Sequence, residues 1–324
     1  MKGTEQRNKD VCQRREKDCR MKKSFIPVTG SFIDGVAADI PGNNWTKRIW
    51  KKELAEQKAM GIDTLVIIRV GFKDSCMYDS PVLRTPLHGS YDLLEFILSE
   101  ADELGMKVFM GLYDSCSYWL KNDWQGEVDL NKRLMDELLN RYRHHRSFFG
   151  WYISHEGDIK FHQEKVWKPL AQKMRADTPE KPVLISPRYA GVKYEPRFAV
   201  TPELHAKHFE YLYSEMDGLI DYAAFMDGHV EFSELPEFMA ATKEVCDRFG
   251  VRFWSNLETF DRDMPWRFPV IEWSKMLFKL KIANQYAEKI ITFEAPHFLS
   301  LNSCYPAAAN LRECYLEFLE ELRK

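Results

Sequence analysis

From Ser24 onward, short apolar runs alternate with longer amphipathic segments, and this alternation is the feature that most constrains the fold. The apolar runs are rich in β-branched and aromatic residues, as strands covered on both faces usually are. The predicted strands lie within 25–34, 63–72, 107–115, 148–154, 181–189, 221–228, 251–260 and 289–298. The predicted helices lie within 45–61, 90–105, 128–146, 165–177, 201–216, 233–250, 271–289 and 308–324. Ser90 and Thr201 are the expected N-caps of two of these helices.

Eight strand-then-helix units of similar length favour an α/β fold in which the sheet closes on itself. We therefore expect a single-domain (β/α)₈ TIM barrel over residues 24–324, preceded by a polar, disordered extension at 1–23. The alternative is an open, doubly wound sheet, which should carry a glycine-rich phosphate loop after its first strand. Residues 29–35 read TGSFIDG, and their spacing does not match that loop.

Composition narrows the partners. The formal net charge is −3 without a basic cluster, which argues against nucleic acid as a partner. No stretch approaches the roughly 18 apolar residues of a membrane helix, so no membrane is expected. No signal peptide is visible, which predicts a cytoplasmic protein as written, or a periplasmic or secreted one if the true start differs. The oligomeric state is left open.

The sequence gives no indication of a cofactor or a metal. The seven cysteines form no short-spaced ligand pair, and the nine histidines are scattered. His144 and His145 end a predicted helix, where positive charge is favourable without any ligand. We expect neither a cofactor nor a metal at the site.

Polar and aromatic residues follow every predicted strand, at the barrel end where active sites of this fold lie. As substrate-binding candidates we take Asp34, Arg69, Tyr113, Asp114, Trp119, His155, Arg188, Asp227, His229, Trp254, Asn256 and Glu294. The loops also carry Trp124 and Trp266, which with Trp119 and Trp254 are candidate platforms for stacking against a sugar. Asp34 is as readily explained as a residue that ties down a loop.

Two glutamates follow the fourth and seventh strands, on roughly opposite sides of an eight-stranded barrel. Glu156 follows GWYISH and Glu258 follows VRFWSNL. Hydrolysis of a glycosidic bond needs two carboxyl groups, one protonated and one ionised, on either side of the bond. Glu156 and Glu258 are therefore the candidate catalytic pair. The other interpretations are a loop-capping carboxylate beside Arg188 for Glu156 and an ion pair with Arg69 or Arg262 for Glu258.

The segment GWYISHE resembles the fourth-strand segment of the large clan of retaining TIM-barrel glycosidases. Together with GSFID, FMDG and WSNLETF, it is similar to a bacterial family that is common in gut Bacteroidetes. The members of that family are classed as glycoside hydrolases of unknown specificity. The resemblance covers Ser24 to about Tyr305. It implies that Glu156 is the general acid/base and Glu258 the nucleophile. His155 departs from the clan, where asparagine is usual, and Glu294 has no counterpart; it is either an alternative nucleophile or a partner of Glu258.

The resulting hypothesis is a retaining glycoside hydrolase acting on an oligo- or polysaccharide, with its two carboxyls about 5–5.5 Å apart. One alternative is a barrel that binds carbohydrate without cleaving it, since a fold does not guarantee activity. A less favoured one is a metal-dependent hydrolase on the same barrel.

Overall fold

The computed structural model of the chain describes residues 25–36, 44–85, 87–88, 90–157, 159, 162–193, 196–262 and 268–324. The extension predicted at 1–23 and the candidate platform Trp266 lie outside these residues. Within them, no helix is both long and apolar enough to cross a bilayer.

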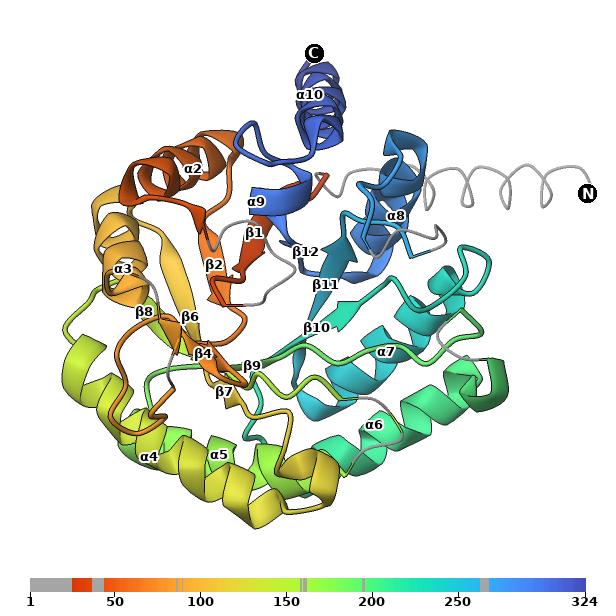
Figure 1. The fold of residues 1–324 in the computed structure, drawn as a ribbon. Coiled ribbons are helices and arrows are strands. Elements are labelled where there is room, and N and C mark those ends of the chain that lie inside the picture. Colours follow the sequence, from red (N-terminus) through yellow and green to blue (C-terminus); the bar gives the residue numbers. More distant parts are fainter. Residues whose placement is uncertain are drawn as a thin grey trace, which may run out of the picture.

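Eight strands form the centre of the molecule, one from each of the eight apolar runs (Figure 1). They are β1 Val28–Ile33, β2 Thr64–Ile67, β6 Lys107–Gly111, β8 Phe148–Tyr152, β9 Val183–Ile185, β10 Tyr222–Met226, β11 Arg252–Glu258 and β12 Lys289–Phe293. All neighbouring pairs are parallel, and the sheet closes in the order β1-β12-β11-β10-β9-β8-β6-β2. The predicted (β/α)₈ barrel is confirmed.

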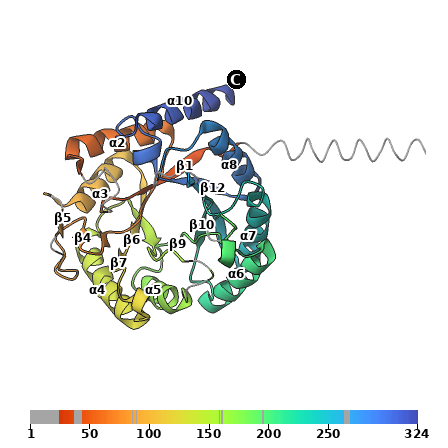
Figure 2. The ribbon, with the colours of Figure 1, turned by 45° about the vertical axis from the view of Figure 1, so that its right-hand side comes forward.

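Each of the eight predicted helices is present, and together they form an outer ring around the strands (Figure 2). They are α2 Lys47–Met60, α3 Leu93–Leu104, α4 Trp124–Tyr142, α5 Glu164–Asp177, α6 Pro202–Met216, α7 Leu235–Phe249, α8 Trp273–Tyr286 and α10 Pro306–Glu321. Shorter pieces are α9 Ala295–Phe298 and the 3-10 turns η2 Trp119–Lys121 and η3 Pro196–Phe198. Thr201 caps α6 as expected. The cap predicted at Ser90 is wrong, because the Asp92 carboxylate accepts the Glu95 N–H at 2.8 Å instead.

A second, small sheet follows the carboxyl ends of β2 and β6 and covers part of that end of the barrel. Its strands are β3 Gly71–Phe72, β4 Ser75–Cys76, β5 Leu87–His88 and β7 Tyr113–Asp114, in the order β5-β4-β3-β7. The sequence pattern placed 71–72 and 113–114 inside the barrel strands, whereas the chain leaves the barrel before them. Tyr113 and Asp114 consequently belong to this sheet.

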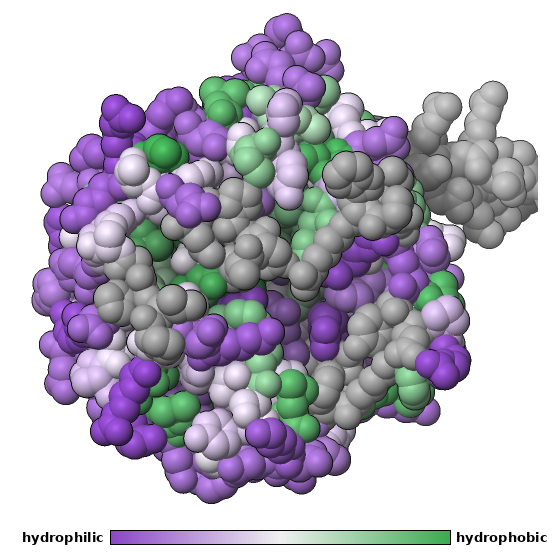
Figure 3. All heavy atoms as spheres, viewed as in Figure 1, coloured by the Kyte–Doolittle hydropathy of each residue, from purple (hydrophilic) through white to green (hydrophobic). Residues whose placement is uncertain are grey.

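The apolar side chains form two separate clusters. One fills the barrel itself and includes Phe32, Phe109, Tyr152 and Trp254. The other lies between the strands and the surrounding helices. A closed cylinder with a packed interior leaves its loop-bearing end as the place for a binding site. A space-filling view shows hydrophilic side chains near the centre of the face seen in Figure 1 (Figure 3).

Candidate active site

Charged side chains from many strands meet at the carboxyl end of the barrel. Glu258 is the last residue of β11, and Arg262 holds both oxygens of its carboxylate. Its side chain is 1% exposed, and both carboxylate oxygens accept bonds from the Arg262 guanidinium, from Nε and Nη2, each at 2.9 Å. Burial alone would raise the pKa of Glu258, but Arg262, with His229 and Lys279, lowers it to about 2. Glu258 is therefore ionised at neutral pH.

The turn after β10 brings backbone directly against Glu258. A Cβ atom on Gly228 would lie 1.6 Å from Glu258 Oε2, so only glycine fits there. The next residue, His229, is buried, and burial lowers the pKa of its imidazole to about 3, although the charge of Glu258 acts in the opposite direction. A neutral imidazole thus lies within the electrostatic reach of the carboxylate.

Asp227 and Lys279 bind the backbone at the end of β11. Asp227 Oδ1 accepts the Glu258 N–H at 3.0 Å and the Lys279 ammonium at 2.7 Å, and Lys279 also donates to the Glu258 carbonyl at 3.1 Å. Asp227 and Lys279 are both nearly inaccessible. Asp227 was expected to contact substrate; the structure instead gives it the task of fixing the backbone that carries Glu258.

Glu156 lies in the loop that follows β8 and is only partly buried. Burial raises the pKa of its carboxyl, and the charges of Asp114 and Glu258 act in the same direction. Arg69 and Arg188 oppose the shift without cancelling it. Glu258 is close enough to influence Glu156, and Arg262 responds to both carboxylates. The two glutamates predicted to act together thus share one electrostatic environment, in which one is pushed toward the protonated form and the other is kept charged.

Arg69, after β2, bridges the neighbouring strand ends rather than pairing with Glu258. Its guanidinium lies 3.5 Å from Asp34 and 3.6 Å from Asp114, and its plane covers the Phe72 ring at 3.9 Å. Asp34 is 2% exposed, and its Oδ1 accepts the Val36 N–H at 3.1 Å. The structure thus shows the contact expected if Asp34 ties down the loop after β1.

His155 is oriented by a buried carboxylate that the sequence did not single out. Its Nε2 lies 2.7 Å from Glu127 Oε1, and Glu127, fully buried on α4, also accepts bonds from the Ser115 N–H and hydroxyl. Among the described residues, His155 Nδ1 has no hydrogen-bond partner. Asp114, Glu127 and His155 are close enough together to be considered as metal ligands. Glu127 is already satisfied by these donors, and the Arg69 cation beside Asp114 would repel a metal ion.

A small cavity opens beside Glu156 and is walled by aromatic residues. Its lining comprises Trp119, Trp124, His155, Glu156, Gly157, Gln163, Val166 and Trp167. Trp119 is fixed by a bond from its indole N–H to Asp114 Oδ1 at 2.8 Å. The candidate platforms Trp119 and Trp124 therefore stand next to the proposed acid, which keeps them as predicted sugar contacts.

Two aromatic candidates are corrected by the structure. Trp254 lies inside the barrel, 5% exposed, with its ring 4.5 Å from Tyr222 and 5.8 Å from Phe109. No face of this indole is open to a sugar. Tyr113 is 8% exposed, and its hydroxyl donates to the Lys73 carbonyl. Its ring packs in the cluster between strands and helices, so it stabilises the small sheet instead of binding substrate.

Two further polar candidates bond to groups inside the barrel. Glu294 is fully buried: one oxygen accepts the Asp34 N–H at 2.9 Å and the other lies 2.7 Å from His297 Nδ1. Burial raises its pKa to about 7, although His297 opposes this. Both oxygens bond to groups of the barrel itself, as those of Glu258 do with Arg262, and the part of Glu294 as an alternative nucleophile stays a prediction. Asn256 is 1% exposed and donates to Ser186 at 3.1 Å, within the barrel beneath Glu258.

The comparisons with known proteins agree with this architecture. A family model described as a domain of unknown function (DUF4434) matches residues 28–307. No curated protein matches the chain. The crystal structure of a "putative alpha-L-fucosidase" from Bacteroides thetaiotaomicron VPI-5482 is 34% identical, with a TM-score of 0.87 over 92% of this chain and 95% of that one.

More distant structures share the fold at low identity. An endo-β-1,4-mannanase from Thermotoga petrophila is 13% identical, with a TM-score of 0.63 over 92% of this chain and 78% of that one. A β-galacturonidase from Eisenbergiella tayi is 10% identical, with a TM-score of 0.55 over 90% of this chain and 51% of that one. Each of these neighbours is a glycoside hydrolase by name; at such identities the likeness establishes the barrel alone.

Proposed function

The chain belongs to the DUF4434 family, and from that premise we propose that it is a retaining glycoside hydrolase in which Glu258 is the nucleophile and Glu156 the general acid/base. The observation that carries the proposal is the opposite direction in which the pKa values of the two carboxyls are shifted. The pKa of Glu258 is lowered to about 2, whereas that of Glu156 is raised. Paired carboxyl groups with opposite shifts are what acid and nucleophile require.

In the first step, a Glu258 oxygen attacks the anomeric carbon while the bond to the leaving oxygen breaks. Glu156 gives its proton to that oxygen, so the leaving group departs as a neutral alcohol. In the second step, ionised Glu156 takes a proton from water, which attacks the same carbon and releases Glu258. The two inversions retain the anomeric configuration. The separation of about 5–5.5 Å that this mechanism needs stays a prediction.

Arg262 and the Asp227–Lys279 pair fit this mechanism as groups that hold the nucleophile charged and in place. A barrel that only bound carbohydrate would have no need to bury a carboxylate and keep it ionised, because burying a charge is costly. The contrast between the pKa values of the two glutamates therefore favours hydrolysis over binding alone.

The test is a panel of aryl glycosides assayed with the wild type and with Glu156→Gln and Glu258→Gln. The relative from Bacteroides thetaiotaomicron places an aryl α-L-fucoside first in the panel. Glu244→Gln, a change on an exposed position of α7, is the matched control and should behave as wild type.

The two roles predict different patterns. Glu258→Gln should abolish turnover of every substrate that the wild type cleaves. Glu156→Gln should slow substrates with poor leaving groups by about 10²–10⁴-fold. It should slow dinitrophenyl glycosides far less in their first step, because that leaving group needs no proton, and added azide should restore turnover. Full activity of either variant would rule out the role assigned to that residue.

A further inference from the structure

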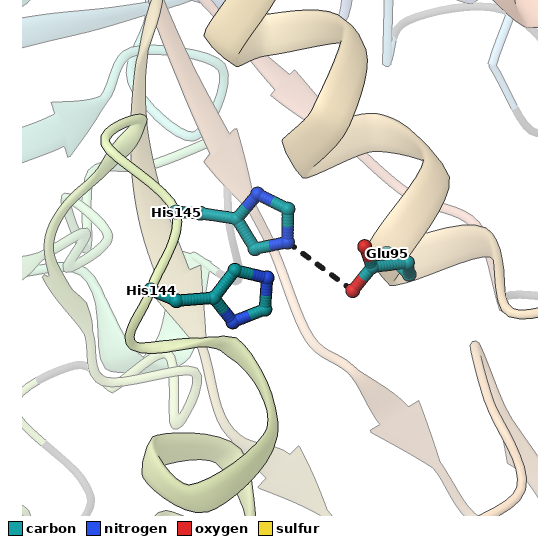
Figure 4. A group of neighbouring side chains, drawn as sticks. All are labelled: Glu95, His144 and His145. Carbon is teal, nitrogen blue, oxygen red and sulfur yellow. Dashed lines mark hydrogen bonds and ion pairs between the residues drawn. The ribbon is translucent and has the colours of Figure 1, made fainter.

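A second cluster of titratable side chains lies on the outer ring, away from the carboxyl ends of the strands. Glu95 projects from α3, and His144 and His145 stand in the turn between α4 and β8. One carboxylate oxygen and one nitrogen from each ring all lie within 4.8 Å of one another. Figure 4 shows both imidazoles turned toward the Glu95 carboxylate.

His145 is held in the orientation that metal-binding histidines usually have. Its Nδ1 lies 2.7 Å from Asp102 Oδ2, and the other Asp102 oxygen accepts the Ser147 N–H at 2.6 Å. A histidine that binds a metal through one nitrogen generally donates the other N–H to such a carboxylate. This leaves Nε2 facing Glu95, whose Oε2 is 3.2 Å away.

The other two members remain accessible to an ion from solvent. His144 is exposed, and its ring centre lies 4.2 Å from that of His145. The Glu95 side chain is 44% exposed, and its remaining hydrogen bond is a long one from the Ser99 hydroxyl at 3.4 Å. Among the described residues, no lysine or arginine lies within ion-pair distance of Glu95. The carboxylate therefore has no competing fixed cation, in contrast to Asp114 at the active site.

We propose that Glu95, His144 and His145 bind one Zn²⁺ ion, with water as the fourth ligand. Two imidazoles and a carboxylate form a donor set typical of zinc, and hard cations such as Mg²⁺ and Ca²⁺ prefer oxygen ligands alone. With zinc–ligand bonds of about 2.1 Å, a tetrahedron has ligand edges of about 3.4 Å. The 3.2 Å between His145 Nε2 and Glu95 Oε2 already approaches that edge.

The position of the cluster indicates a structural role for the ion rather than a catalytic one. The turn that carries both histidines leads into the amino end of β8, whereas catalysis in this fold takes place at the carboxyl end. A bound ion would fasten α3 to this turn, alongside the Asp102 contacts that already join them. The helix-end interpretation of the two histidines accounts for where they stand in the chain but not for why both rings face one carboxylate.

The test is calorimetric titration of the chelator-treated full-length chain with Zn²⁺, together with Glu95→Gln and His144→Ala. The wild type should bind one Zn²⁺ per chain, unaffected by excess Mg²⁺ or Ca²⁺. Each variant should bind at least about 10-fold more weakly, and Asp102→Asn about 10–100-fold more weakly. His162→Ala removes a histidine that pairs with Glu164 at 3.2 Å on another part of the surface, and it should bind as wild type.

Thermal unfolding supplies a second measurement. At free Zn²⁺ about 100-fold above Kd, the Tm of the wild type should rise by several degrees, and the rise should be lost in Glu95→Gln and His144→Ala. The proposal is overturned if the wild type neither binds Zn²⁺ nor gains Tm. It is equally overturned if the two variants bind as tightly as the wild type, since the zinc would then be held elsewhere, for example by cysteines.

Discussion

Replacement of Arg262 should raise the pKa of Glu258 and so change the pH dependence of activity. Arg262 is the largest influence that opposes the burial of Glu258, and it donates both hydrogen bonds to the carboxylate. The gap between a pKa of about 2 and the ordinary 4.5 corresponds to roughly 3 kcal/mol in favour of the ionised form. Because the pKa is lowered on folding, this term stabilises the chain fully above pH 4.5 and is lost as the pH falls toward 2.

Arg262→Gln removes the charge but keeps a hydrogen-bond donor. Burial is then less opposed, so the pKa of Glu258 should rise to its ordinary 4.5 or above, although the Lys279 cation still acts on it. A nucleophile must be ionised, so activity falls as the pH drops through this pKa. The assay is kcat/KM of an aryl glycoside from about pH 4 to 8, which reports pKa values of the free enzyme.

The variant should gain an acid limb near pH 4.5 or above that the wild type lacks in this range. Arg252→Gln is the matched control, because Arg252 makes a comparable ion pair with Glu288 at 2.8 Å on the surface. Its profile should match the wild type. If Arg262→Gln also superimposed on the wild type, Arg262 would not be what keeps the carboxylate charged, and the reasoning would fail.

Three further changes test neighbouring parts of the site. Arg188→Gln removes a cation that lowers the pKa of Glu156, so the acid should stay protonated longer and the basic limb of kcat/KM should move to higher pH; a shift to lower pH contradicts this. Gly228→Ala should displace Glu258 by more than 1 Å and lower kcat by about 10²-fold, and a wild-type kcat would refute the contact. Lys279→Met leaves a buried carboxylate without its cation, so urea unfolding should show a loss of about 3–5 kcal/mol, against no change if the pair were idle.

The fold followed from the sequence because each unit repeats one local pattern. Strands buried on both faces are continuously apolar, and helices packed on one face are periodic, so all eight units could be placed. The small sheet could not, since its strands are two residues long and carry no period. The Ser90 cap was wrong for a related reason: Asp92, two residues on, is an equally good cap, and the helix begins there.

At the site, strand-end position indicated the two glutamates as candidates but could not predict which groups each side chain bonds to. Trp254 points into the barrel as Glu258 does, but it is the third residue of β11 and so lies near the amino end of that strand. Tyr113 lies beyond the barrel strand, in the small sheet, and its ring packs in the cluster between strands and helices. Glu127 and Lys279 were missed because they lie on helices, where a charged residue normally faces solvent. The available signal was a charged residue at a position where the helical pattern calls for an apolar one, and both residues stand at such a position.

The most direct test of the account is to trap the glycosyl-enzyme. A 2-deoxy-2-fluoro analogue of the aryl glycoside that the wild type cleaves is incubated with the chain, which is then digested and analysed by mass spectrometry. We predict one added glycosyl group, on the peptide that contains Glu258. An adduct on Glu156 or Glu294, or hydrolysis that inverts the anomeric configuration, would contradict the assignment.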